Sequence, residues 1–175
     1  MTEVGVTHRL HLLRHAKSSW KDRGLSDRER PLNGRGREAC KLIAAMLPSA
    51  GVRPDAVIVS PARRTAETYE LIEGGLRGDY EHWTEKRLYG ASTDGLLEVI
   101  RELPEAVGEA LVIAHNPAIE SLALILAGEA GAGAERMRTK YPTGAMATFA
   151  IAAPWARLGP TAAALERFVR PKDLR

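Results

Sequence analysis

Three apolar runs, each followed by a polar segment and then a helical pattern, constrain the fold of this 175-residue chain more than any other feature. The runs are RLHLLR (9–14), DAVIVS (55–60) and EALVIAH (109–115). Nearly continuous apolar strands are typical of a parallel sheet that is buried on both faces. We therefore predict an α/β fold, with a mainly parallel central sheet flanked by helices on both faces.

The rest of the chain fits the same pattern. Apolar residues at helical spacing predict helices over 33–47, 61–74, 93–103 and 117–127. Two late runs, 144–152 and 163–170, alternate apolar and polar residues and predict an antiparallel edge near the C-terminus. A glycine-rich stretch, 128–140, is interpreted as a flexible connection. No repeat or linker interrupts the chain, so we expect a single domain over residues 1–175.

Composition limits the possible partners. The net charge of +3 is small and its cations are dispersed, which argues against nucleic-acid binding. The N-terminal MTEVGVTHRL lacks a signal-peptide pattern, and no apolar run is long enough to span a membrane. The single cysteine, Cys40, lies on an apolar helix face and is expected to be a buried thiol. We expect a cytoplasmic protein, and the sequence does not indicate an oligomeric state.

Polar side chains stand where the three apolar runs end. Arg14 and His15 follow the first run, Ser60 ends the second and His115 ends the third. Ligands of open α/β sheets bind outside the carboxyl ends of the strands, so these side chains are expected to meet. Ser60 and Asn116 each precede a proline, the pattern of a helix N-cap followed by the first helical residue. Helix N-termini favour anions, so the sequence predicts a phosphate or sulfate pocket.

A histidine in such a pocket has a chemical use beyond binding. A neutral imidazole nitrogen can attack phosphorus and form a phosphohistidine, which water then hydrolyses. Arginines and a second, protonated histidine would stabilise the charge on the equatorial oxygens of the transition state. The residues that could do this are Arg14, His15, His115 and an arginine of the ARR segment at 62–64. This chemistry requires no metal ion and no cofactor.

Four motifs in order, LLRHAKSSW, PLNGRGREA, VIVSPARRTAET and LVIAHNP, resemble the histidine phosphatase (phosphoglycerate mutase-like) superfamily. The resemblance covers residues 9–127 and is greatest to its small SixA-like branch of phosphohistidine phosphatases. It implies that His15 is phosphorylated, that Arg14 and Arg64 hold the phosphate, and that His115 is the second pocket histidine. Helix periodicity does not separate Arg63 from Arg64, and the family pattern chooses Arg64.

The sequence departs from the superfamily at two points. Its usual Arg-His-Gly reads Arg-His-Ala here, with Ala16 in place of the glycine, as in similar small members. No clear counterpart of the acidic segment of larger members is present. Glu85 is the assigned general acid, and Asp22 or Asp27 in the 16–31 loop are the alternatives.

The remaining predicted site residues are substrate contacts, namely Lys17, Ser18 and Asn116. The leading hypothesis is a phosphatase that acts on a protein-borne phosphohistidine, because a short chain leaves little material for a lid. A phosphatase or mutase for a small phosphorylated metabolite, such as a sugar or nucleoside phosphate, is the alternative. A non-catalytic phosphate-binding module is the second alternative.

Overall fold

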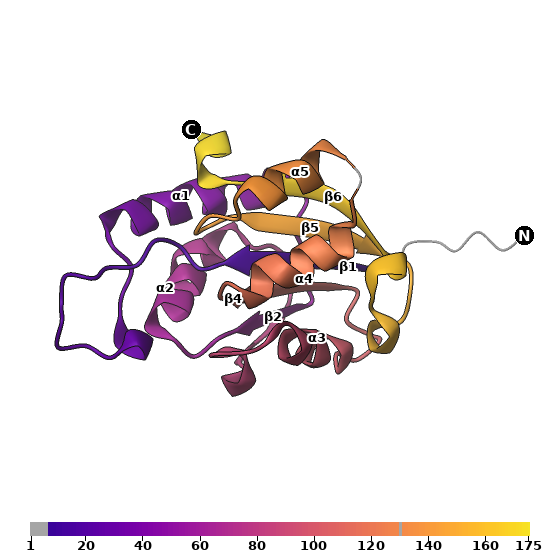
Figure 1. Ribbon diagram of the computed structural model, residues 1–175, viewed down its shortest axis with the longest axis horizontal. Helices are drawn as coiled ribbons and strands as arrows, with labels where there is room; N and C mark the ends of the chain where they lie inside the picture. The colour runs from indigo at the N-terminus through magenta and orange to yellow at the C-terminus, as the bar shows by residue number, and fades with distance from the viewer. Residues whose placement is uncertain (1–6, 130) are drawn as a thin grey trace, which may run out of the picture.

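The computed structural model describes residues 7–129 and 131–175, and within them it contains one six-stranded sheet in the order β3-β2-β4-β1-β5-β6 (Figure 1). The strands are β1 (His8–Arg14), β2 (Ala56–Val59), β3 (Glu81–Thr84), β4 (Glu109–Ala114), β5 (Met146–Ile151) and β6 (Ala163–Val169). Strands β3, β2, β4 and β1 run parallel, whereas β5 is antiparallel to β1 and β6 is antiparallel to β5. The predicted mainly parallel sheet with an antiparallel edge is confirmed.

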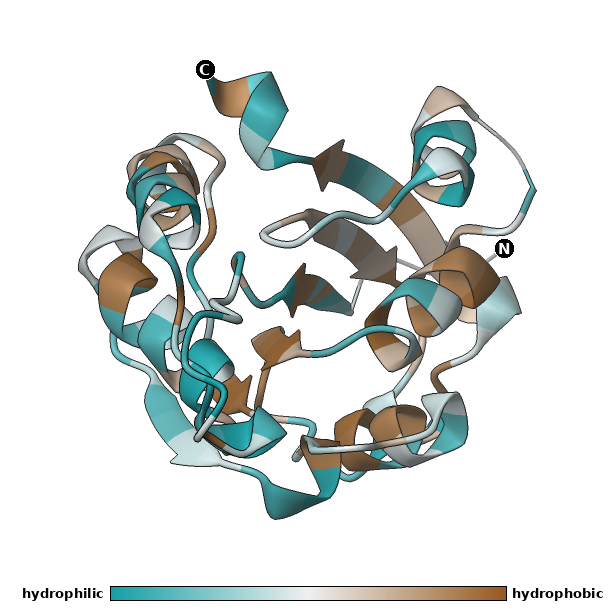
Figure 2. Cartoon of the chain, turned by 60° about the vertical axis from the view of Figure 1, so that its left-hand side comes forward, coloured by the Kyte–Doolittle hydropathy of each residue, from teal (hydrophilic) through white to brown (hydrophobic). Residues whose placement is uncertain are grey.

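Helices cover both faces of this sheet, as the sequence predicts. They are α1 (Gly34–Ser49), α2 (Arg63–Ile72), α3 (Thr93–Arg101), α4 (Ala118–Ala127) and α5 (Ala132–Thr139). One core cluster joins the strands to α1 and α2, and the other joins them to α3, α4 and α5. Leu12 belongs to one cluster and Leu13 to the other, because successive strand residues point to opposite faces. Figure 2 shows the mostly apolar central strands enclosed between helices.

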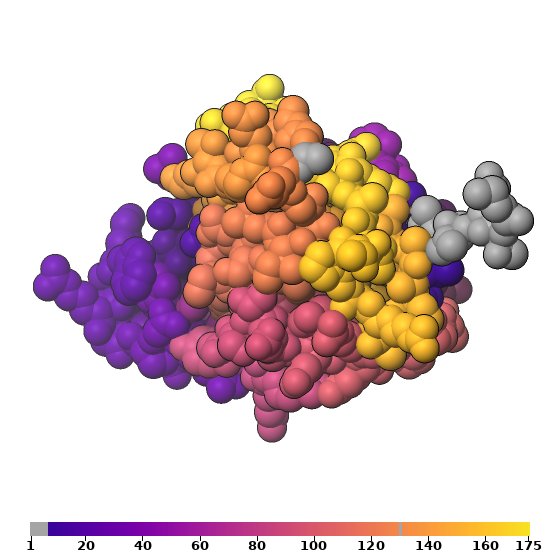
Figure 3. Space-filling view, turned by 45° about the vertical axis from the view of Figure 1, so that its right-hand side comes forward, coloured from indigo at the N-terminus to yellow at the C-terminus, as the bar shows by residue number. Residues whose placement is uncertain are grey.

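The prediction of a flexible connection over 128–140 is wrong, because most of this segment forms α5. Ala134 and Met137 of this helix are fully buried. A Cβ atom added at Gly133 would lie 2.9 Å from a methyl group of Leu165 in β6. Gly133 therefore permits close packing of a helix on a strand. In Figure 3 the region of α4 and α5, in orange, packs between the C-terminal segment and the residues around α3.

The loop over 16–31 extends beyond the rest of the molecule (Figure 1). Its base is closed by a β-bridge between Ser18 and Leu32. The buried Arg30 guanidinium donates to the Ser18 hydroxyl (2.8 Å) and lies 3.5 Å from the ring centroid of Trp20. A short 3-10 helix, η1 (Asp27–Glu29), turns the loop back toward the sheet. The loop is thus long but internally bonded.

Two sequence expectations concern the ends of the chain and its relation to membranes. Most of the N-terminal MTEVGVTHRL, residues 1–6, lies outside the described residues. Within the part of the chain that the structure describes, no helix combines the length and apolarity that crossing a membrane requires.

Candidate active site

The carboxyl ends of β1, β2 and β4 bring the predicted polar residues to one edge of the sheet. The His15 amide donates to the carbonyl of Ala114 (3.1 Å), and the Ser60 amide donates to the carbonyl of Ile113 (3.0 Å). These bonds continue the parallel ladders by one step, so His15, Ser60 and His115 follow three neighbouring strands. The His15 and His115 rings lie 5.3 Å apart between centroids.

His15 is held in one tautomer. Its Nδ1 lies 2.7 Å from the carbonyl oxygen of Ala16. A carbonyl oxygen can only accept, so Nδ1 carries the proton and Nε2 keeps its lone pair. Burial, together with the nearby His115, Arg64 and Arg14, lowers the pKa of His15 to about 3, although the hydrogen bond to Ala16 opposes the shift. In the free protein at neutral pH, His15 is therefore a neutral imidazole with an unprotonated Nε2.

Two arginines contribute cationic groups to this edge. Arg14 donates to the carbonyl of Tyr141 (2.9 Å), and Arg64 donates to the backbone carbonyl of Asp27 (2.7 Å). The Nε atoms of both arginines are buried and have no hydrogen-bond partner among the described residues. Buried donors without a partner are costly, and an anion with several acceptor oxygens would satisfy them. By contrast Arg63, one residue earlier on α2, is exposed and pairs with Glu67 at 2.8 Å.

His115 is oriented by Ser60, which is not the helix cap that the sequence suggests. Helix α2 begins after Ala62, whose side chain makes no capping hydrogen bond, and the prediction that Ser60 caps it is wrong. The Ser60 hydroxyl lies 2.7 Å from His115 Nε2 instead. His115 Nδ1 is buried and has no partner in the described part of the chain. It is therefore a second ring nitrogen left free for a ligand.

His115 is neutral in the free protein, whereas the expected protonated histidine belongs to the transition state. Burial, followed by Arg64 and more weakly Arg14, lowers the pKa of His115 to about 4, although Asp27 opposes the shift. Two neighbouring guanidinium groups disfavour a third positive charge. His115 thus rests in its neutral form and would gain a proton only when an anion enters between these cations.

Asn116 bonds mainly to the fold around it. Helix α4 has Pro117 at its N-cap position, one residue later than the sequence predicts. The Asn116 side chain still caps the helix, because its Oδ1 accepts from the amide of Glu120 (3.2 Å). Its Nδ2 donates to the carbonyl of Tyr141 (3.2 Å), the same carbonyl that accepts from Arg14. Asn116 therefore ties α4 to the segment that holds Arg14.

Asp27 is the loop carboxylate that reaches this edge. Its Oδ2 accepts from Arg64 (3.1 Å) and from the hydroxyl of Tyr89 (2.7 Å), and its Oδ1 accepts from Arg30 (3.1 Å). The hydrogen bond from Tyr89, followed by Arg64 and Arg30, holds the pKa of Asp27 at about 2 although desolvation opposes the shift. Asp27 is therefore ionised at neutral pH and holds one side of the Arg64 guanidinium.

The other two acid candidates lie in different surroundings. Glu85 accepts from the Arg87 guanidinium at 3.0 and 3.1 Å, and Arg87 also pairs with Glu102. The hydrogen bonds from Arg87 lower the pKa of Glu85. Asp22 accepts from the amide of Gly24 within its own loop (2.9 Å). Both Glu85 and Asp27 are thus ionised in the free protein, and neither holds a proton ready for a leaving group.

The predicted substrate contacts Lys17 and Ser18 lie in different environments. Ser18 is buried and its hydroxyl accepts from Arg30, so it supports the loop. Lys17 is exposed. Ala16 is fully buried, and its amide donates to the hydroxyl of Thr68 (3.1 Å). No described residue other than glycine has a positive φ, so alanine occupies position 16 without strain.

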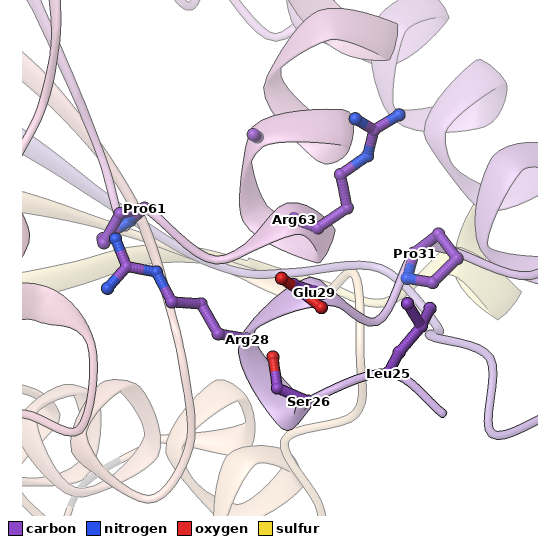
Figure 4. Close-up of a pocket in the computed structure, with 8 residues that line it drawn as sticks. Leu25, Ser26, Arg28, Glu29, Pro31, Pro61 and Arg63 are labelled. Atoms are coloured by element: carbon purple, nitrogen blue, oxygen red, sulfur yellow. The ribbon is translucent and has the colours of Figure 1, made fainter. Parts of the chain in front are cut away.

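A cavity of about 560 Å³ lies beside this edge, between the loop and the start of α2. Figure 4 shows Arg28 reaching toward Pro61, Leu25 beside Pro31, and Arg63 extending from the first turn of α2. The lining mixes apolar groups with arginines and one carboxylate, Glu29. The cavity adjoins the turn that leads from Ser60 to Arg64, so it can receive groups next to whatever binds at the histidines.

Sequence reasoning gave no role to three contributors to the site. Tyr89 anchors Asp27, the Tyr141 carbonyl holds Arg14, and Thr68 links the backbone at Ala16 to the carbonyl of Arg64 (2.7 Å). Tyr141 lies 127 residues from Arg14 in the chain, and its role depends on a carbonyl that every residue type carries. Only Thr68 left a signal, since it lies on the same helix face as Arg64.

Comparison with known proteins gives concordant results. The model of the histidine phosphatase superfamily (branch 1) matches residues 10–89. The uncharacterised protein Rv1276c of Mycobacterium tuberculosis (strain ATCC 25618 / H37Rv) is 36% identical over 163 residues, which cover 91% of this chain and all of that protein.

Solved structures share the fold over nearly the whole chain. A protein of Nakamurella multipartitia assigned as the phosphohistidine phosphatase SixA is 24% identical, with a TM-score of 0.81 over 94% of this chain and 96% of that chain. The protein histidine phosphatase SixA complexed with tungstate is 22% identical, with a TM-score of 0.76 over 95% and 99%. The alpha-ribazole phosphatase of Shigella flexneri is 18% identical, with a TM-score of 0.67 over 93% and 96%.

Proposed function

Because this chain belongs to the histidine phosphatase superfamily, we propose that it hydrolyses a protein-borne phosphohistidine through a phosphoryl intermediate on His15. One observation carries the proposal. The Nδ1–H of His15 donates to the Ala16 carbonyl, so an unprotonated Nε2 lies buried beside two guanidinium groups that have free Nε donors. A neutral nucleophile next to unsatisfied cationic donors is what attack on a phosphoryl group requires.

The reaction takes place in two steps. His15 Nε2 attacks phosphorus, a new P–N bond forms, and the P–N bond to the substrate imidazole breaks. Arg14, Arg64 and His115 bind the equatorial oxygens, whose negative charge favours protonation of His115. Water then attacks phosphorus, the bond to His15 Nε2 breaks, and inorganic phosphate leaves with the proton balance restored by solvent.

The leaving group supports phosphohistidine over an alkyl phosphate. An alkoxide leaves only if a general acid protonates it, whereas an imidazole leaves as a neutral molecule once its other nitrogen is protonated. Asp27 and Glu85 are both ionised by their arginine and tyrosine partners. A site without a protonated carboxyl group suits the more labile P–N bond.

The relatives of SixA type support the same substrate class, since the solved proteins that share the fold include a protein histidine phosphatase complexed with tungstate. Small-metabolite phosphatases share the fold too, so the substrate must be tested directly. A panel of a phosphohistidine peptide, an aryl phosphate and several sugar and nucleoside phosphates separates the two. We expect the phosphohistidine peptide to have the highest kcat/KM, and a higher value for a sugar or nucleoside phosphate would overturn the assignment.

The nucleophile is tested with His15→Ala and a matched control, His82→Ala, which removes an exposed histidine that stacks on Tyr69. We expect His15→Ala to abolish both hydrolysis and a trapped phosphoenzyme that is acid-labile and alkali-stable, and His82→Ala to retain both. Unchanged turnover by His15→Ala would exclude His15 as the nucleophile. Binding of phosphate without hydrolysis of any substrate by the wild type would indicate a non-catalytic module.

A further inference from the structure

A cavity of about 340 Å³ lies on the other side of the His15 turn and is lined by cations. We call it the basic cavity and define it by its four cationic residues, Lys17, Arg35, Lys140 and Arg175. No aspartate or glutamate lines it. It differs in this respect from the cavity of Figure 4, where Glu29 accompanies the arginines.

These four cations are electrostatically unsatisfied. None forms an ion pair or a side-chain hydrogen bond within residues 7–129 and 131–175, whereas some exposed arginines elsewhere, such as Arg63 and Arg87, pair with carboxylates. Arg35 also lies in the first turn of α1, which contains no acidic residue. The helix dipole disfavours a cation there and favours an anion. Like charges gathered without partners repel, and a bound anion offsets both costs.

The walls of the basic cavity are fixed to the turn that carries the nucleophile. Lys17 follows His15 and Ala16 directly in the sequence. Helix α1 packs tightly on the backbone of Lys17, since a Cβ added at Gly36 would lie 2.1 Å from the Lys17 carbonyl oxygen. On the opposite wall, the amide of Gly144 donates to the carbonyl of His15 (3.0 Å), and the loop between Lys140 and Gly144 holds Arg14 through the Tyr141 carbonyl. The cavity therefore adjoins the phosphoryl site.

We propose that the basic cavity is a second anion site, which binds aspartate or glutamate side chains that surround the phosphorylated residue of a protein substrate. The inference rests on the proposed phosphatase function for its biological setting, although binding can be tested without turnover. Such a site would select substrates by charge at positions next to the phosphohistidine.

The character of the cations favours a protein surface over a small ligand. Lys17, Arg35, Lys140 and Arg175 are all exposed, so their long side chains are mobile and hydrated. Mobile exposed cations bind dispersed carboxylates through many weak, salt-sensitive contacts, which steer and select a partner. A small ligand held by fixed geometry would call for buried, pre-oriented donors such as those at Arg14 and Arg64.

The test combines binding and turnover. Binding of a labelled, unphosphorylated peptide rich in aspartate and glutamate is compared with that of a matched peptide with asparagine and glutamine. Both are measured for the wild type, for Arg35→Glu/Lys140→Glu, and for the control Arg77→Glu/Arg157→Glu. The control makes the same change in net charge at exposed residues. Arg77 precedes the parallel strand β3, and Arg157 follows β5, which is antiparallel to β1. Both therefore lie toward the amino ends of the parallel strands, away from the carboxyl end that carries His15.

We expect the wild type and the control to bind the acidic peptide about tenfold more tightly than the amide peptide at low salt, and Arg35→Glu/Lys140→Glu to lose this preference. With phosphohistidine versions of both peptides, the same preference is expected in kcat/KM. Hydrolysis of an aryl phosphate should stay within about twofold in all three proteins, which shows that the variants fold.

Three results would overturn the inference. They are equal binding of the two peptides by the wild type, a preference that persists in Arg35→Glu/Lys140→Glu, and a preference lost equally in the control. If citrate displaces the acidic peptide at equal carboxylate concentration, the ligand of the basic cavity is a small anion and not a protein surface. Failure of the proposed function has a different signature, namely a binding preference without hydrolysis of either phosphohistidine peptide.

Discussion

At the scale of single residues, the position of one proton decides what this site can do. The Ala16 carbonyl fixes the proton of His15 on Nδ1, and burial keeps the ring neutral. Arg64 contributes in a different way, because its guanidinium is shared between Asp27 and the space beside the histidines. Arg63, its neighbour in sequence, pairs with Glu67 at the surface. Adjacent arginines on one helix thus have separate tasks.

Arg64→Ala is expected to reduce kcat on the order of 100- to 1,000-fold, as does removal of one transition-state donor in other enzymes. Arg64→Lys should also reduce it, because an ammonium group cannot form the planar fork of a guanidinium. Arg63→Ala is the matched control and should stay within about threefold of the wild type. Steady-state hydrolysis of an aryl phosphate provides the measurement, and a larger loss in Arg63→Ala would reverse the assignment.

Much of the site follows from the sequence at this scale, because strand ends carry Arg14, His15 and His115 to one edge. The sequence does not predict which partner each polar side chain hydrogen-bonds to. Ser60 before a proline has the pattern of a helix cap, yet its hydroxyl bonds to His115, which follows a different strand. The contact of Asp27 with Arg64 depends on how the 16–31 loop folds back, which no local pattern records.

At the scale of elements, the start of α1 joins the helix layer to the turn that carries His15. The Asn33 side chain caps the helix, because its Oδ1 accepts from the backbone amide of Gly36 (2.8 Å). The backbone amide of Asn33 donates to the carbonyl of Lys17 (3.0 Å). Gly36 contacts the same carbonyl and has no room for a side chain. Gly34, two residues earlier, faces open space, with nothing within 4 Å of an added Cβ.

Gly36→Ala is expected to lower the free energy of unfolding by about 1–3 kcal/mol, the usual cost of overpacking. Gly34→Ala should leave it unchanged or raise it by up to about 1 kcal/mol, because alanine has the higher helix propensity. Urea denaturation of both variants tests the difference. Equal midpoints would show that α1 can move away from Lys17 without cost.

Element positions were predictable wherever burial produces a clear period, as in α1, α3 and α4. The helix α5 was not, because its glycines and short apolar face resemble a flexible connection. Gly133 in fact serves close packing against Leu165, a contact with a strand that comes later in the chain. Tertiary packing, which the local sequence does not encode, decides this element.

At the scale of the whole molecule, the buried histidines couple stability to pH. Their pKa values in the folded protein are about 3 for His15 and about 4 for His115, below the value of about 6.5 expected for an unfolded chain. Between these limits the unfolded chain binds more protons than the folded protein. The free energy of unfolding is therefore not reduced by these histidines above about pH 6.5. It declines as the pH falls toward 4, because protonation of the histidines favours the unfolded chain.

We expect the free energy of unfolding to decrease from pH 7 to pH 5, by up to about 1.4 kcal/mol per pH unit for each of the two histidines. The double variant His15→Gln/His115→Gln should show a shallower dependence over this range. Urea titrations at several pH values provide the measurement. Parallel curves for the wild type and the variant would place the pH dependence elsewhere in the molecule.

The central position of β1 in the sheet also determines how much of the chain must be synthesised before the site can assemble. Strand β1, which leads to His15, is the first of the described strands, but its partners β4 and β5 end at Ala114 and Ile151. A nascent chain that emerges from the ribosome in order carries His15 long before it carries the strands that hold it in place. Truncated products that end before β5 should therefore contain the reactive histidine and lack phosphatase activity altogether.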